Sequence, residues 1–208
     1  MLRKYSILFG IIIGLLLLFI ATLYYPGGSQ YDRNAAGYDW KNNYLSNLFG
    51  PKAMNGADNA SRPWAVAGMF FLCAGIVVFF IEFPKKIPSK GAARVVTWFG
   101  AGGMLCAFLA VTPYHDIMIT IASTLVLVSM FYITVFVFRS KLHLFKILCV
   151  IGLIVPYCCN YVYYTGHYLA FLPIMQKVCI ATTITWVLAL QYFTTTNDFA
   201  SKKAVATK

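Results

Sequence analysis

Six long apolar stretches constrain this chain more than any other feature of its sequence. They cover residues 7–24, 64–83, 95–112, 117–138, 147–164 and 169–193. Each is long enough to cross a bilayer core of about 30 Å as a helix, and none alternates with the period of two expected of a barrel strand. Because backbone groups in lipid must be paired within the protein, such stretches fit helices. The sequence therefore predicts an all-α fold, a polytopic membrane bundle of six transmembrane helices.

The composition fits one membrane domain followed by a short tail. The 208-residue chain is 60% hydrophobic and 11% charged, whereas about a quarter of the residues in a soluble domain are charged. We expect residues 1–193 to form the transmembrane domain and the polar residues 194–208 to form a disordered cytoplasmic tail. The connection between the first two helices, residues 25–63, is by far the longest.

The 17 lysines and arginines fall mostly in alternate connections. Those on one side are Arg3, Lys4, Lys85, Lys86, Lys90, Arg94, Arg139, Lys141, Lys146, Lys202, Lys203 and Lys208. Those at or near the other side are Arg33, Lys41, Lys52, Arg62 and Lys177. The positive-inside rule then places both termini in the cytoplasm and the long first loop outside. We expect an integral protein of a plasma membrane or a bacterial inner membrane.

The net charge of +11 could also suit a nucleic-acid-binding protein. The basic residues, however, are scattered over short turns beside the apolar stretches, where they orient the helices and contact anionic headgroups. We therefore predict membrane lipids as partners and no nucleic acid. All six cysteines lie within the apolar stretches and form no Cys-x-x-Cys pair, so neither a disulfide framework nor a cysteine zinc site is predicted. The sequence also has no phosphate-binding glycine loop, haem pair or redox motif, so no cofactor is predicted.

Polar and aromatic residues gather at the predicted outer side. Eleven of the 14 tyrosines lie there: Tyr24, Tyr25, Tyr31, Tyr38, Tyr44, Tyr114, Tyr157, Tyr161, Tyr163, Tyr164 and Tyr168. An interfacial aromatic belt explains tyrosines at helix ends, but a belt should form on both faces. An outer pocket lined partly by tyrosine is the other interpretation. Within the long loop, residues 40–48 could form a short amphipathic helix that lies at the membrane interface or folds back over the bundle.

Three predicted helices carry candidate site residues near their outer ends. The fourth begins with His115 and Asp116, and the aspartate can also cap the helix N-terminus. The fifth carries Asn160, Tyr164 and His167 on one face at helical spacing.

The sixth predicted helix places Lys177 about two turns below its outer end, a depth at which lysine is uncommon. We expect it to pair with Asp116 or with an acid of the first loop. His115 and His167 could join an aspartate at a metal ion, but their spacing does not place them on one helix face, so no metal is predicted.

Two short segments resemble a known family. Residues 43–48 read Asn-Tyr-Leu-Ser-Asn-Leu, and residues 112–116 read Thr-Pro-Tyr-His-Asp. With the six-helix layout, they resemble the domain-of-unknown-function family numbered 998 and the DRAM/Frag/Sfk-like group. The resemblance implies a six-helix bundle without an established activity and singles out Ser46, Asn47 and His115.

These features favour a protein that binds a lipid or a small amphipathic ligand at the outer face. The alternative is a membrane-embedded, hydrolase-like enzyme acting on a lipid or envelope substrate. In that case His115 is the general base, Asp116 or Asp39 orients it, and Lys177 stabilises an anion. A small-solute transporter is a third possibility, although the helix centres are mostly apolar.

Overall fold

The structure, a computed structural model, describes residues 2–200 of the chain, and their side chains from residue 5 onward. Its elements are α1 (Leu2–Leu23), η1 (Leu45–Phe49), α2 (Arg62–Glu82), η2 (Phe83–Lys86), α3 (Lys90–Leu109), α4 (His115–Arg139), α5 (His143–Thr165), η3 (Leu169–Phe171), α6 (Leu172–Phe193) and η4 (Thr196–Phe199). Six helices are long and apolar enough to cross a membrane. The described part contains no strand beyond two isolated bridges. The predicted all-α fold with six membrane-length helices is thus confirmed.

The helix bounds differ most from prediction at α3. This helix begins at Lys90 rather than at residue 95, because the Ser89 side chain accepts a hydrogen bond from the backbone N–H of Ala92 and caps the first turn. It ends at Leu109, and Pro113 follows in the turn to α4. A charged first turn is therefore part of the helix although it lies outside the apolar stretch.

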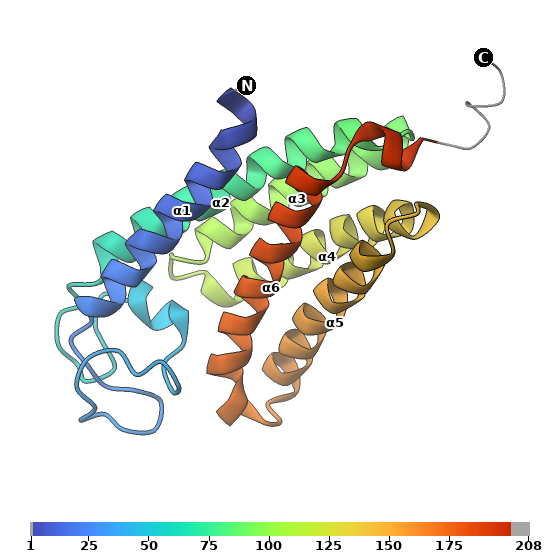
Figure 1. The fold of residues 1–208 in the computed structure, drawn as a ribbon. Coiled ribbons are helices and arrows are strands. Elements are labelled where there is room, and N and C mark those ends of the chain that lie inside the picture. The colour runs from blue at the N-terminus through green and yellow to red at the C-terminus, as the bar shows by residue number, and fades with distance from the viewer. Residues whose placement is uncertain (1, 201–208) are drawn as a thin grey trace, which may run out of the picture.

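The helices run back and forth between two ends of the bundle (Figure 1). One end, called the basic end here, holds the start of α1, the turns 83–89 and 140–142, and η4. The other, called the loop end, holds the connection 24–61 and the shorter turns 110–114 and 166–168. Which end faces the cytoplasm stays a prediction of the charge pattern.

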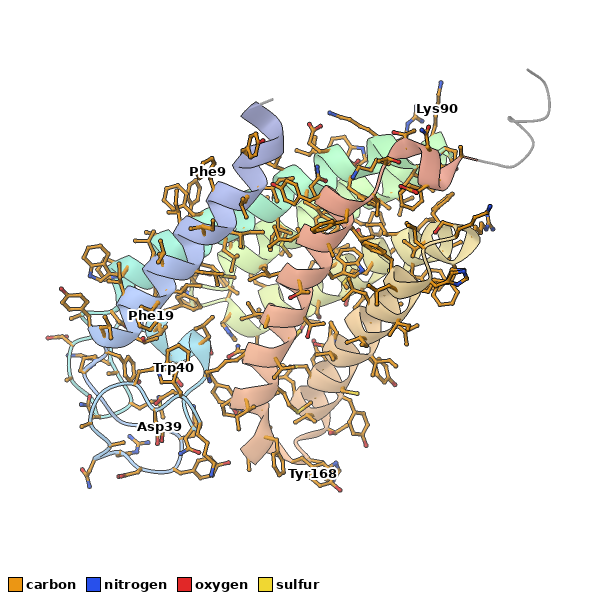
Figure 2. All side chains as sticks on the ribbon, in the orientation of Figure 1. Phe9, Phe19, Asp39, Trp40, Lys90 and Tyr168 are labelled. Atoms are coloured by element: carbon orange, nitrogen blue, oxygen red, sulfur yellow. The ribbon has the colours of Figure 1, made fainter. Side chains whose placement is uncertain are left out.

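Large apolar side chains cover the outside of the bundle, as expected of a surface in contact with lipid. Phe9 and Phe19 project from α1 with 59% and 53% of their surface exposed (Figure 2). On α5, Leu144, Ile147 and Ile154 are similarly exposed. These features, with the six long apolar helices, are those of a multi-pass integral membrane protein.

Glycines bring α1 and α2 into close contact. A Cβ atom added at Gly14 would lie 2.7 Å from the backbone N of Leu72 and 2.9 Å from the carbonyl O of Gly68. At Gly10 it would lie 2.9 Å from the Cα of Gly75. Small residues four apart allow this backbone approach, which van der Waals packing then stabilises in lipid.

The segment after α6 is ordered where the structure describes it, which corrects the expectation of a disordered tail for residues 194–200. Phe199 is 6% exposed, and its ring centroid lies 5.7 Å from that of Phe83. The Lys86 ammonium donates to the carbonyl oxygens of Leu190, Gln191 and Thr194 and so satisfies the last turn of α6. The remainder of the predicted tail, residues 201–208, lies outside the described residues.

Candidate functional site

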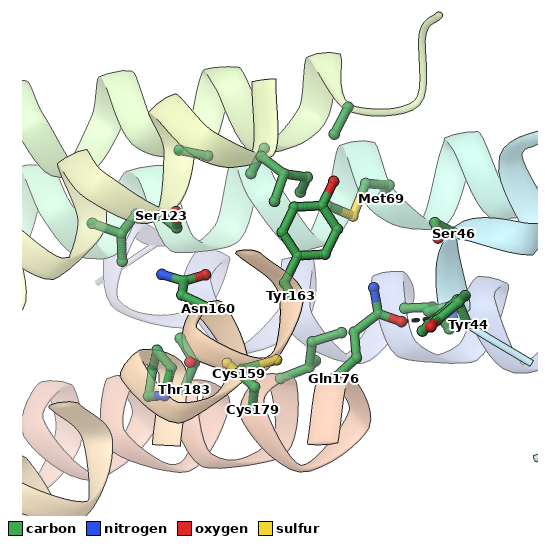
Figure 3. Close-up of a pocket in the computed structure, with 18 of the residues that line it drawn as sticks. Tyr44, Ser46, Met69, Ser123, Cys159, Asn160, Tyr163, Gln176, Cys179 and Thr183 are labelled. Carbon is green, nitrogen blue, oxygen red and sulfur yellow. Dashed lines mark hydrogen bonds between the residues drawn. The ribbon is translucent and has the colours of Figure 1, made fainter. Parts of the chain in front are cut away.

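A cavity of about 510 Å³ lies among α2, α3, α4, α5 and α6, in the half of the bundle next to the loop end (Figure 3). Its volume is within the range of cavities that bury small ligands. Most of its wall is apolar: Leu72, Ile76, Met104, Val126, Met130 and Ile184 contribute. Most polar groups of the lining lie toward the loop end: Tyr44, Ser46, His115, Asp116, Asn160, Tyr163 and Gln176. Ser123 and Thr183 add two hydroxyl groups deeper in the wall (Figure 3). The cavity therefore has a mostly apolar body and a polar mouth.

The long connection between α1 and α2 covers one side of the mouth of this cavity. Its η1 segment and the residue before it contribute Tyr44, Leu45, Ser46 and Phe49 to the lining. The helical part is shorter than the predicted 40–48: it is a 3-10 helix that covers only Leu45–Phe49. Asn47 fixes its start, since its Oδ1 accepts from the backbone N–H of Tyr44 at 2.7 Å.

The Asp39 carboxylate accepts hydrogen bonds within a turn that precedes η1. Its Oδ1 accepts from the backbone N–H of Lys41 at 2.9 Å, and its Oδ2 accepts from the side-chain amide of Asn42 at 2.7 Å. Partial burial opposes ionisation, but these hydrogen bonds outweigh it and hold the pKa of Asp39 below its ordinary value. Burial raises the pKa of Tyr38, the residue that precedes Asp39. Asp39 thus shapes the loop.

Buried asparagines hold the rest of the loop together. The Asn43 side-chain amide is fully buried and donates to the carbonyl of Gly28 at 2.9 Å. The Asn59 amide donates to the carbonyls of Asn47, Leu48 and Gly50. These bonds satisfy backbone groups that burial would otherwise leave unpaired, so the loop has a defined conformation held by internal hydrogen bonds.

Two adjacent residues of α6 fasten this loop over the cavity. Gln176 Oε1 accepts from the backbone N–H of Leu45 at 2.7 Å. Lys177 Nζ donates to the carbonyl oxygens of Asn43 at 2.7 Å and Pro173 at 3.0 Å, and lies 5.6 Å from the centroid of the Tyr38 ring. Its direct partners are therefore main-chain oxygens; of the predicted carboxylates, Asp39 of the first loop attracts the ammonium electrostatically without a direct bond. The lysine is satisfied by main-chain oxygens and acts as an anchor of the loop.

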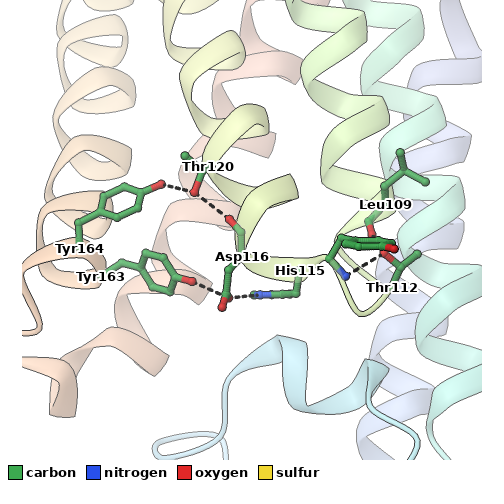
Figure 4. A network of polar contacts seen from close by, with 8 residues as sticks. Leu109, Thr112, His115, Asp116, Thr120, Tyr163 and Tyr164 are labelled. Atoms are coloured by element: carbon green, nitrogen blue, oxygen red, sulfur yellow. Dashed lines mark hydrogen bonds and ion pairs between the residues drawn. The ribbon is translucent and has the colours of Figure 1, made fainter.

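A small polar network bridges α4 and α5 at the mouth (Figure 4). His115 Nδ1 lies 3.0 Å from Asp116 Oδ1, and the Tyr163 hydroxyl donates to the same oxygen at 2.6 Å. One turn further along α4, the Tyr164 hydroxyl donates to Thr120 Oγ1 at 2.8 Å. The Asp116 side chain is 82% exposed and that of His115 is 31% exposed, so both remain accessible.

The structure brings together part of the predicted site. The predicted residues that line the cavity are Ser46, His115, Asp116 and Asn160. Those outside its lining are Asp39, Asn47, Tyr164, His167 and Lys177. His167 follows the left-handed Gly166 in an exposed turn, so the two histidines do not share the cavity. Among the residues that the structure describes, no group of three His, Cys, Asp or Glu side chains could hold a metal ion.

Other lining residues carry a periodic pattern that is visible in the sequence. On α6, Gln176, Cys179 and Thr183 are spaced three and four residues apart, which places them on one helix face. Cys159 of α5 lies beside Cys179 in the cavity wall (Figure 3). Small and weakly polar residues at this spacing indicated a shared face, but not that the face borders a cavity.

Replacement of the two anchors should loosen the loop. We expect Gln176→Leu combined with Lys177→Met to raise hydrogen exchange of the amides of residues 38–49 by about tenfold or more, because a hydrogen bond from a charged donor contributes about 1.5–3 kcal/mol. Mass spectrometry of exchanged peptides measures this. Lys52→Met is the control, since the Lys52–Asp58 pair is 61% and 92% exposed and should contribute little. Equal exchange in wild type and the double variant would contradict the anchoring role.

Comparison with known proteins adds no relative: no family model, no curated protein and no solved structure matches this chain.

Proposed function

We propose that this multi-pass membrane protein binds a lipid or a small amphipathic ligand in the cavity beneath the η1 segment. The single observation that carries the proposal is the division of the cavity into an apolar body and a polar mouth. An amphiphile has the same division, with a hydrocarbon chain and a polar head. Burying the chain removes apolar surface from water at about 25 cal/mol per Å², while the mouth supplies hydrogen-bond partners for the head.

A second feature supports access from the bilayer. An apolar groove on the α4–α5 surface is lined by Leu127, Leu153, Ile154 and Tyr157. Leu127 also belongs to the cavity lining, so the groove and the cavity border the same side chain. A hydrocarbon chain in lipid would meet this groove before it meets the cavity.

The charge pattern supports binding at the outer side of the membrane. The cavity opens at the loop end, whereas Lys85, Lys86 and Lys141 of the turns 83–89 and 140–142 lie at the basic end. By the positive-inside rule the mouth faces outward, at the outer leaflet of a plasma membrane or a bacterial inner membrane.

Photolabelling tests this function. The purified protein in detergent micelles would be irradiated with a long-chain alcohol that carries a diazirine on its alkyl chain. We expect saturable labelling that an excess of the unlabelled alcohol prevents, because the cavity provides one defined site. An unrelated six-helix membrane protein of similar size is the control, and labelling no stronger than in that control would overturn the proposal.

The hydrogen bond between His115 and Asp116 supports a second candidate, a hydrolase-like enzyme acting on a lipid or envelope substrate. Asp116 Oδ1 engages Nδ1 of the imidazole at 3.0 Å, which leaves Nε2 to accept a proton as a general base. Ser46 lines the same cavity and could serve as nucleophile. Asp39 and Lys177 have no part in this candidate, since both are engaged within the loop and its anchor.

A further inference from the structure

The cavity mouth carries an acidic side chain but no lysine or arginine. Asp116 is the acidic residue of the lining, and no lysine or arginine contributes to it. Gln176 and Asn160 are neutral amides, and Tyr44 and Tyr163 are neutral phenols. A histidine carries charge only when protonated, so the permanent charge of the mouth at neutral pH is the negative charge of the Asp116 carboxylate.

Asp116 differs from two other acids of the described chain in its partners. Glu82 pairs with the ammonium of Lys85 at 2.7 Å, and Asp58 pairs with that of Lys52 at 2.6 Å. Within residues 5–200, the ion-pair partner of Asp116 is His115 alone, and its other side-chain bond is to the Tyr163 hydroxyl. The carboxylate therefore lacks a permanent cation beside it.

Lys177 is the cationic residue nearest in sequence to the cavity lining, and its ammonium already donates hydrogen bonds elsewhere. Lys177 follows Gln176 of the lining by one residue, yet its ammonium donates to the carbonyl oxygens of Asn43 and Pro173 and does not line the cavity. Turning it toward the mouth would break both bonds, one of which holds Asn43 of the loop to α6. The mouth thus keeps its negative character as long as the loop is docked.

Two tyrosine rings border the same mouth. Tyr44 enters from the residue before η1 and Tyr163 from α5, and both belong to the cavity lining (Figure 3). Tyrosine faces attract ammonium groups through the ring quadrupole, and a carboxylate beside them adds direct attraction. Together they provide what an ammonium headgroup needs when it leaves water.

We propose that the cavity selects amphiphiles whose headgroup is cationic, an amine in its ammonium form or a quaternary ammonium, over amphiphiles with an anionic head. This inference rests on the proposed binding function and names its ligand class. An anionic sulfate or carboxylate head would lie beside the Asp116 carboxylate with no cationic side chain in the lining to offset it, and like charges repel.

Three photoprobes with the same diazirine-bearing alkyl chain test the inference, one with a trimethylammonium head, one with an alcohol and one with a sulfate. We expect the ammonium probe to label at a concentration about tenfold lower than the sulfate probe, with the alcohol between them. Added salt should reduce the difference, because screening weakens attraction and repulsion at an exposed mouth.

The Asp116→Asn variant separates the charge from the shape of the site. Asparagine keeps the size and can still accept from the Tyr163 hydroxyl, so the readout is the ratio of ammonium to alcohol labelling within the same variant, and this ammonium preference should fall to about twofold or less. Asp58→Asn, in the exposed pair with Lys52, is the control and should keep the full preference. Sulfate labelling equal to or stronger than ammonium labelling in the wild type would overturn the inference and leave ligand binding intact. If none of the three probes labels the protein, the binding function itself fails.

Discussion

Ser123→Phe is expected to reduce photolabelling by a long-chain alcohol at least tenfold. Ser123 lines the cavity from α4, where its hydroxyl donates to the carbonyl of Thr120 at 3.1 Å (Figure 3). A phenyl ring at this position would occupy space that the alkyl chain of the ligand needs. Since tenfold in affinity corresponds to about 1.4 kcal/mol, the loss of contact for two methylene groups is enough to produce it. Titration of labelling against probe concentration measures the change.

The neighbouring residue offers a matched control for this variant. Thr124 also donates its hydroxyl to the carbonyl of Thr120, at 2.9 Å, but it is exposed on the outside of the bundle and does not line the cavity. Thr124→Phe places the same ring on the next position and should leave labelling within about twofold of wild type. Equal labelling of Ser123→Phe and Thr124→Phe would mean that the ligand does not occupy this cavity.

Gly14→Ala is expected to destabilise the protein strongly for a one-carbon change. The new Cβ would lie 2.7 Å from the backbone N of Leu72 and 2.9 Å from the carbonyl O of Gly68, and backbone atoms cannot turn aside as a side chain can. Overpacking of this kind costs about 1–3 kcal/mol, which exceeds the gain of up to about 1 kcal/mol in helix propensity. The thermal midpoint in detergent micelles, followed by circular dichroism, should fall.

Gly102→Ala separates the contact from the helix propensity. Gly102 lies inside α3, and a Cβ added there meets only the Cδ1 atom of Leu125 at 3.8 Å, an ordinary contact distance. This variant should therefore be as stable as wild type or more so. A Gly14→Ala protein with an undiminished midpoint would show that α1 and α2 do not pack as closely as the structure indicates.

The membrane helices could be predicted because the bilayer imposes their length. Each apolar stretch must span the hydrocarbon core, so its existence follows from composition and its ends follow within a few residues. The bounds of α3 were missed because Ser89 and the charged first turn extend the helix beyond the apolar part. The α1–α2 contact was missed for another reason, since Gly14 and Gly68 are visible in the sequence but their pairing is not.

The candidate site could be predicted only in part, because its geometry depends on contacts between distant positions. Leu45 and Gln176 are 131 residues apart, and no local pattern indicates that their hydrogen bond closes the loop over the bundle. The unusual depth of Lys177 correctly indicated a specific partner, but the direct partners are main-chain oxygens, and Asp39 of the first loop acts only through longer-range attraction. His115 and Asp116 were singled out by position, and Tyr163 joins them through packing of α5 on α4.

The position at which the photolabel inserts is the most direct test of the central claim, that the cavity beneath η1 holds the hydrocarbon part of an amphiphile. Peptide mapping by mass spectrometry after irradiation with the diazirine alcohol would locate it. We expect insertion at residues of the cavity wall such as Met104, Met130 or Ile180, at one label per chain, and its loss in Ser123→Phe. Insertion confined to outward-facing residues such as Phe9 or Phe19 would contradict the claim.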